Sequence, residues 1–202
     1  MSKFRLLLGT KNPGKVEEAR EILAGGDEDL DLFSYRDREF SDVEETGDTY
    51  AENSLKKARE INEETGLPVL SDDSGLEVAG LDGAPGPRSA RFAGRDATDE
   101  ENLSLLLERL EGVNDREARF VTVATLFISP EERYMARGVL NGEIIRKPRG
   151  DSGFGYDPVF VPDGFKRTLA QLGEEQKNEI SHRRKALEKV REELEVIGRR
   201  QS

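Results

Sequence analysis

The apolar positions near the start of the chain change from a continuous run to a helical spacing. An apolar run at residues 4–8 precedes a polar loop at residues 9–15, and the apolar residues after the loop recur at the spacing of one helix face. This order predicts a strand, a tight loop and a helix. Asn12 suits the N-cap of the helix, and Pro13 suits its first position, where the missing N–H costs nothing.

The next segments continue this alternation of strand and helix. Residues 30–35 are apolar enough to form a second strand. Thr49 and Glu52 have the spacing of a capping box, in which each side chain accepts a hydrogen bond from the other residue's backbone N–H. We therefore expect a helix to begin near Thr49, with Asn53 and Lys57 one turn apart on it.

Further strand and helix signals complete the first half of the chain. A short buried strand is expected at residues 68–70, followed by a polar turn at residues 71–75. Thr98 and Glu101 form a second capping box and predict a helix that continues to about residue 110. This alternation is typical of an α/β fold.

The second half is richer in strands. Residues 118–128 are rich in β-branched and aromatic residues, and a short polar turn separates them from residues 134–140, so we predict a long hairpin. A further strand is expected at residues 142–146, and a last helix at about residues 181–197. Without a repeat or a long linker, the pattern predicts one domain over residues 1–202, an α/β fold with a mixed sheet and flanking helices.

The composition narrows the kinds of partner. The chain contains no cysteine, so thiolate metal sites and disulfides are excluded and a metal would be held by oxygen. Lys and Arg number 31 and Asp and Glu 42, and the net charge of −11 argues against binding to a nucleic acid polymer. A small anionic ligand would need a local basic pocket and a divalent cation. No apolar run approaches the roughly 20 residues of a membrane helix and no signal peptide is evident, so we expect a cytoplasmic protein without a membrane partner.

Three polar segments are candidates for phosphate and metal chemistry. The loop at residues 10–15 places two lysines at a helix start, where free N–H groups and the helix dipole favour a phosphate, although its composition is equally typical of an ordinary turn. Asp72 and Asp73 could hold a hard cation or activate water, or could form an Asp-rich turn. As neighbours on an extended segment, their side chains should point to opposite sides. Glu44 and Glu45 are further ligand candidates or solvated surface charges.

Two segments of the second half could recognise a base. Residues 153–158 combine glycines with Phe154, Tyr156 and Asp157, which suits a loop that stacks on a base or one that packs its own aromatic rings. His182, the one histidine, lies in a basic sequence where a helix is expected to start. Positive charge there opposes the helix dipole, which favours a functional role, although a lone histidine is more often structural.

Together these segments resemble the inosine triphosphate pyrophosphatase family, whose members hydrolyse ITP, dITP and XTP. The resemblance spans nearly the whole chain, and its motifs fall in the family's order and approximate spacing. The motifs are Thr10-x-Asn12-x-x-Lys15, Glu45-Thr46-Gly47-x-Thr49, Asp72-Asp73-Ser74-Gly75-Leu76, Gly83-Ala84-Pro85-Gly86, Ser89-Ala90-Arg91, residues 153–158 and Ser181-His182-Arg183.

The resemblance implies an α/β fold with two lobes around a nucleotide-binding cleft, a homodimer, and Mg²⁺-assisted attack of water at the α phosphorus of a purine nucleoside triphosphate. By similarity, Asp73 is the catalytic residue, and Mg²⁺ is held by Glu45, Asp73 and Asp72, with Glu44 as the alternative to Glu45. The residues expected to bind the substrate are Thr10, Lys11, Asn12, Pro13, Gly14, Lys15, Lys57, Ser74 and Lys177, with Phe154, Gly155, Tyr156 and Asp157 at the base and His182 and Arg183 at its 6-keto edge.

The expected donors at His182 and Arg183 would explain discrimination against ATP, because its 6-amino group would leave them unpaired. They do not explain how GTP, which also has a 6-oxo group, is rejected. The competing interpretations are a pyrophosphatase for other modified nucleotides, such as methylated pyrimidines, a nucleotide sensor without catalysis, and an acidic structural protein. The acidic pair and the basic loop argue against the last two.

Overall fold

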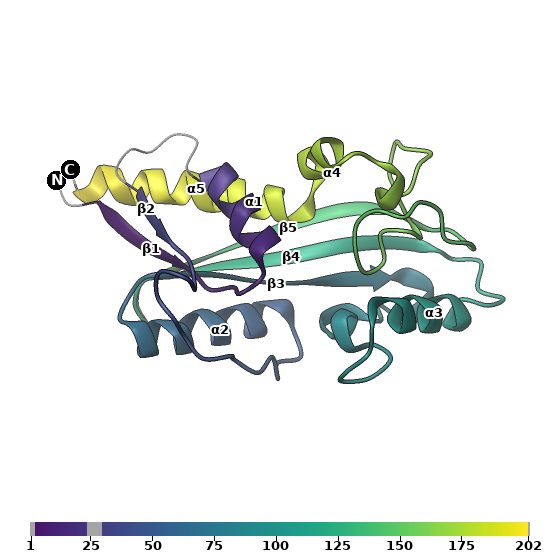
Figure 1. Ribbon diagram of the computed structural model, residues 1–202, viewed down its shortest axis with the longest axis horizontal. Coiled ribbons are helices and arrows are strands. Elements are labelled where there is room, and N and C mark those ends of the chain that lie inside the picture. Colours follow the sequence, from purple (N-terminus) through teal and green to yellow (C-terminus); the bar gives the residue numbers. More distant parts are fainter. Residues whose placement is uncertain (1–2, 24–29, 202) are drawn as a thin grey trace. The chain divides into compact units, whose positions relative to one another are not determined.

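The computed structural model describes residues 3–23 and 30–201, which form a mixed sheet with helices against it (Figure 1). The strands are β1 (Phe4–Leu8), β2 (Leu30–Phe33), β3 (Val69–Val78), β4 (Glu117–Phe127), β5 (Arg133–Ile144) and β6 (Phe160–Pro162). The helices are α1 (Pro13–Leu23), α2 (Tyr50–Thr65), α3 (Asp99–Arg109), α4 (Glu174–Ile180) and α5 (His182–Gln201), and short 3-10 helices lie at η1 (Ala79–Leu81), η2 (Gly86–Arg91) and η3 (Leu169–Gln171).

The six strands are hydrogen-bonded in the order β2-β1-β3-β4-β5-β6. β1 pairs in parallel with β2 and with β3, whereas β6 pairs with β5 in the antiparallel sense. This mixed pairing confirms the predicted fold class. No helix in the described part of the chain is long and apolar enough to cross a bilayer.

The chain forms two compact units. The first unit consists of Met1–Asp73, Thr122–Gly138 and Arg183–Ser202, and the second unit of Ser74–Val121 and Val139–His182. β3, β4 and β5 therefore contribute residues to both units.

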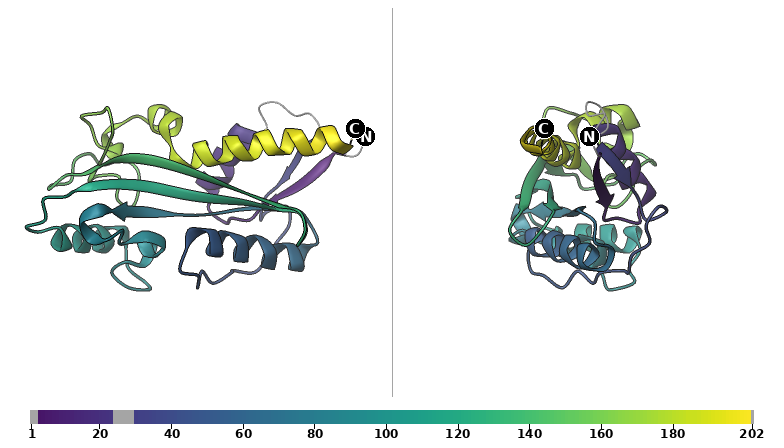
Figure 2. Two further views of the ribbon diagram at one scale, coloured as in Figure 1. Left: turned by 180° about the vertical axis from the view of Figure 1, so that it is seen from behind. Right: turned by 90° about the vertical axis from the view of Figure 1, so that its left-hand side faces the viewer.

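In the first unit, the alternation of side chains along β1 explains why helices cover both faces of the sheet. Leu6 and Leu8 belong to a buried cluster with the apolar faces of α1 and α5. Leu7, which points the other way, belongs to a second cluster with Ala58 and Ile61 of α2. Figures 1 and 2 show α1 and α5 on one side of β1 and α2 on the other.

The helix starts follow the local signals in the sequence. α1 begins at Pro13, and the side-chain oxygen of Asn12 accepts a hydrogen bond from the backbone N–H of Lys15 at 3.2 Å, so Asn12 is the N-cap. The capping boxes predicted before α2 and α3 are both formed.

The second unit has its own core, built from β3, β4, β5, α3 and the segments that follow β5. Leu76 and Val78 of β3 pack in one buried cluster with Leu106 of α3, Ile144 of β5 and Phe160 of β6. Tyr156, an aromatic residue of the loop that was predicted to bind the base, also packs in this cluster.

Two strand predictions were wrong in their bounds. β3 does not end at residue 70 but continues through Asp72 and Asp73 as far as Val78, although Asp is depleted in strands. The residues after 141 continue β5 and do not start a new strand. Gly142 allows this, because a side chain there would meet the backbone oxygen of Val161 at 2.2 Å where β6 pairs with β5.

Candidate active site

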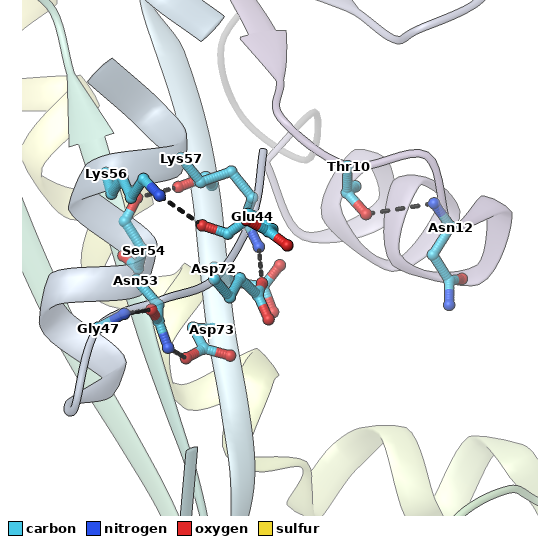
Figure 3. A network of polar contacts seen from close by, with 12 residues as sticks. Thr10, Asn12, Glu44, Gly47, Asn53, Ser54, Lys56, Lys57, Asp72 and Asp73 are labelled. Atoms are coloured by element: carbon cyan, nitrogen blue, oxygen red, sulfur yellow. Dashed lines mark hydrogen bonds and ion pairs between the residues drawn. The ribbon is translucent and has the colours of Figure 1, made fainter. Parts of the chain in front are cut away.

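The predicted acidic pair lies within β3, and its two carboxylates have different partners. Asp72 and Asp73 are 7% and 5% exposed. The Oδ2 atom of Asp72 accepts hydrogen bonds from Lys15 Nζ at 2.8 Å and from Arg183 Nε at 3.3 Å. The Oδ2 atom of Asp73 accepts one from Asn53 Nδ2 at 2.9 Å, on the side of α2 (Figure 3). The two neighbours therefore point to opposite sides, and the alternative of an Asp-rich turn is wrong.

Three cations surround Asp72 in the first unit. Burial alone would raise the pKa of Asp72, but Lys15, Arg183 and Lys57 outweigh it and hold that pKa well below its usual range. Burial lowers the pKa of Lys15, and Asp72 opposes this shift. For Lys57, burial is outweighed by Asp72 and Glu45, so its pKa is raised. The cluster thus contains an ionised carboxylate, and the cations around it have the charge that a phosphate group would need.

The segment before α2 is joined to that helix by two lysines. Lys57 Nζ lies 2.8 Å from Glu45 Oε1. Lys56 Nζ donates to the backbone oxygen of Glu44 at 2.7 Å and to Thr46 Oγ1 at 3.1 Å (Figure 3). Of the two candidate ligands, Glu45 therefore has its carboxylate beside the cation cluster, while Glu44 is anchored by its backbone and its side chain is exposed.

The two lysines of the first loop have different surroundings. The backbone N–H of Asn12 donates to Thr10 Oγ1 at 3.2 Å, which fixes the loop before α1. Lys15, in the first turn of α1, reaches Asp72. Lys11 lies instead 2.8 Å from the exposed carboxylate of Asp42. The structure thus brings Lys15 to the acidic pair and directs Lys11 to a surface ion pair.

In the second unit, three of the predicted substrate contacts lie together. Phe154 is 64% exposed, and Lys177 Nζ lies 4.5 Å from the centroid of its ring. Lys177 forms an ion pair with the buried carboxylate of Asp157, whose Oδ2 atom also accepts from the backbone N–H of Phe154 at 3.0 Å. Gly153 has φ +85°, and a Cβ there would lie 2.2 Å from Asp157 Oδ2, so only glycine fits this turn.

The neighbouring residues of that loop anchor it. Tyr156 is 4% exposed, and its hydroxyl donates to the backbone oxygen of Ser89 at 2.8 Å. Burial raises the pKa of Tyr156, so the hydroxyl stays protonated. The backbone N–H of Gly155 donates to Asp99 Oδ2 at 2.7 Å. The interpretation that the loop packs its own aromatic ring therefore holds for Tyr156, whereas Phe154 is presented to solvent.

The two residues predicted at the 6-keto edge have different neighbours. In the second unit, the ring of His182 stacks on Phe120 with a centroid distance of 5.1 Å and an interplanar angle of 16°. In the first unit, Arg183 contacts Asp72 and also Glu18, at 2.9 Å between Nη1 and Oε2. Nothing in the local sequence singles out Phe120 or Glu18, because an aromatic residue in a strand and a glutamate on a helix are both ordinary.

The donor set is compatible with magnesium, although the described residues hold no group of three or more His, Cys, Asp or Glu arranged for a metal ion. Mg²⁺ is commonly bound through one or two carboxylates together with substrate phosphates and water. Asp73 and Glu45 supply such carboxylates in the first unit, with no cysteine to favour a softer metal.

The fold agrees with comparisons with known proteins. Residues 6–193 match the sequence profile of the Ham1 family, and the chain belongs to that family. It is 44% identical over 193 residues to a dITP/XTP pyrophosphatase of Coxiella burnetii, covering 93% of this chain and 94% of that protein. It is 46% identical over 199 residues to one of Mycolicibacterium paratuberculosis, covering 96% and 97%.

Solved structures give the same result. A HAM1 protein from Coxiella burnetii superposes with a TM-score of 0.88 at 41% identity, covering 95% of this chain and 98% of that one. The Staphylococcus aureus Ham1 protein superposes with a TM-score of 0.86 at 38% identity and the same coverage. The resemblance found in the sequence is therefore confirmed.

The cation cluster predicts a large effect of Asp72→Asn on stability. This change removes the buried carboxylate that pairs with Lys15 and Arg183, and it leaves Lys15 without this ion pair, so the free energy of unfolding in urea should fall by about 3 kcal/mol. Asp42→Asn is the control, because that carboxylate pairs with Lys11 but its side chain is 90% exposed, and its effect should stay within about 0.5 kcal/mol. Equal effects of the two substitutions would contradict the role of Asp72 as a buried counter-ion.

Proposed function

We propose that this protein hydrolyses non-standard purine nucleoside triphosphates, namely ITP, dITP and XTP, to the monophosphate and pyrophosphate. The observation that carries the proposal is the group of three cations around Asp72, one residue from Asp73. A triphosphate carries roughly three to four negative charges, which such a group can neutralise. The relatives named dITP/XTP pyrophosphatase, which match nearly the whole chain, support the same substrate class.

The cations and the start of α1 bind the phosphates in this proposal. Lys15 and Lys57 exchange part of their contact with Asp72 and Glu45 for phosphate oxygens. The backbone N–H groups at the start of α1, beside Thr10 and Asn12, add uncharged donors along the helix dipole. Binding thus replaces carboxylate oxygens by phosphate oxygens around the same cations. The positive charge of the cations is therefore neutralised both with and without bound nucleotide.

The neighbouring carboxylates have separate tasks. In this proposal Asp73 orients the attacking water and accepts its proton, because its carboxylate faces Asn53, on the side of β3 opposite to the contacts of Asp72 with Lys15 and Arg183. Asp72 acts as the counter-ion of the cation cluster and supports the metal site only indirectly. Glu45 and Asp73 would hold Mg²⁺, which when bound would neutralise phosphate charge and polarise the phosphoryl group.

Residues of the second unit recognise the base. Phe154 offers an exposed ring for stacking, with its loop fixed by Asp157, Lys177 and the buried Tyr156. His182, held flat against Phe120, offers a donor to the 6-oxo group of hypoxanthine or xanthine. Arg183, a residue of the first unit, is the other donor that the resemblance implies for the 6-oxo group, in addition to its contacts with carboxylates. We also expect a homodimer, as the resemblance implies, and a cytoplasmic location, as the sequence pattern predicts.

The test of this function is product release from a panel of nucleoside triphosphates. With Mg²⁺, ITP, dITP and XTP should each yield one pyrophosphate per monophosphate, and ATP and GTP should react far more slowly. Chelation of the metal with EDTA should abolish turnover, and added Mg²⁺ should restore it. Stepwise release of orthophosphate, or equal rates with ATP and ITP, would contradict the proposal, and a preference for methylated pyrimidine nucleotides would favour the competing pyrophosphatase.

Asp73→Asn should lower kcat for ITP by at least about 100-fold, because asparagine keeps the shape but cannot accept the proton of water. The affinity for nucleotide should change much less, since the cations and the base loop are intact. If Asp73 only packed within β3, asparagine could accept the same hydrogen bond from Asn53 and turnover would be near normal. Single-turnover rates with ITP, measured beside calorimetric binding, separate these outcomes.

Phe154→Ala should weaken nucleotide binding by about 1–3 kcal/mol, the usual size of base–aromatic stacking. Because this ring is mostly exposed, the free energy of unfolding should change by no more than about 0.5 kcal/mol. Phe154→Tyr, which keeps the ring, should bind as the wild type does. Unchanged affinity in the alanine variant would show that the ring does not contact the base.

A further inference from the structure

The side chain of Asn53 connects Asp73 to the segment that carries Glu45. Asn53 lies in the first turn of α2 and is 1% exposed. Its Oδ1 atom accepts a hydrogen bond from the backbone N–H of Gly47 at 2.7 Å. Its Nδ2 atom donates to Asp73 Oδ2 at 2.9 Å (Figure 3). One amide therefore touches both the carboxylate and the loop before α2.

Only one orientation of this amide satisfies its partners. The backbone N–H of Gly47 can only donate, so the oxygen of Asn53 must face it and the NH₂ group must face Asp73. The approach is close, because a Cβ on Gly47 would lie 2.8 Å from Asn53 Oδ1 and 2.7 Å from Glu52 Cβ. Glycine at this position therefore permits a contact that ties the loop to the amide.

Asn102 follows the capping box of α3 as Asn53 follows that of α2, and it is 2% exposed. Its Oδ1 atom accepts from the backbone N–H of Ala93 at 2.8 Å, and its Nδ2 atom donates to the backbone oxygen of Ala90 at 3.1 Å. Both asparagines join a helix start to a preceding loop, but only Asn53 gives its donor to a carboxylate.

We propose that Asn53 is a positioning residue, whose amide fixes the orientation of the Asp73 carboxylate relative to the segment of Glu45. This inference rests on the proposed function, in which Asp73 acts on water. A carboxylate on a short side chain rotates readily, and a hydrogen bond from a rigid amide restricts that rotation to one range. Rates depend steeply on such positioning, whereas ground-state binding of the nucleotide does not.

The experiment compares Asn53→Asp with Asn102→Asp. The first change keeps the acceptor for Gly47 and nearly the same shape, but replaces the donor facing Asp73 by an oxygen. We expect kcat for ITP to fall at least about tenfold, the size of one lost hydrogen bond in the transition state, with KM changed less than about threefold. Asn102→Asp makes the same chemical change at a matched buried position, and its kcat should remain within about threefold of the wild type.

Two further measurements separate positioning from folding. Binding of the α,β-imido analogue of ITP, which resists cleavage, is measured by calorimetry and should be nearly unchanged in Asn53→Asp. The melting temperature should fall in both aspartate variants, and further in Asn53→Asp, because its new carboxylate faces that of Asp73. Should Asn53→Asp fold poorly, Asn53→Ala removes both hydrogen bonds without adding charge, and the same loss of kcat is expected.

The outcomes distinguish this inference from the proposed function. Wild-type kcat in a folded Asn53→Asp or Asn53→Ala protein overturns the positioning role and leaves the function intact. A parallel loss of kcat, analogue binding and thermal stability also overturns it, because the residue would then be merely structural. A wild-type protein that releases no pyrophosphate from any triphosphate refutes the proposed function and the inference together.

Discussion

The neutralisation of one buried carboxylate, Asp72, by nearby cations is the interaction on which the rest of the site depends. Its burial in β3 is compatible with an ionised state only because Lys15, Arg183 and Lys57 lie around it. These three cations come from the starts of α1 and α5 and from α2, segments that are far apart in the sequence. The placement of three helices in the first unit is thus coupled to one charge.

The geometry of β3 gives two chemically identical residues different partners. Alternation along β3 directs Asp72 toward the cations and Asp73 toward the amide of Asn53. The different hydrogen-bond partners of the two carboxylates, and the separate roles that we propose for them, follow from strand geometry.

Local signals in the sequence predicted the elements well, and long-range contacts account for what they missed. The N-cap at Asn12 and the capping boxes at Thr49 and Thr98 depend on residues within one turn, so their spacing was sufficient. The continuation of β3 through the acidic pair could not be predicted, because it requires cations from distant segments. The pairing of Arg183 with Glu18 and the contact of Asn53 with Asp73 likewise leave no trace in local sequence.

The most direct test of the account is hydrolysis of ITP in water labelled with ¹⁸O, with mass spectrometry of both products. If Asp73 directs water to the α phosphorus while the cations hold the remaining phosphates, the label should appear in inosine monophosphate and not in pyrophosphate. Label found in pyrophosphate would mean attack at the β phosphorus, and it would contradict the assignment of the cation cluster and Asp73 to this reaction.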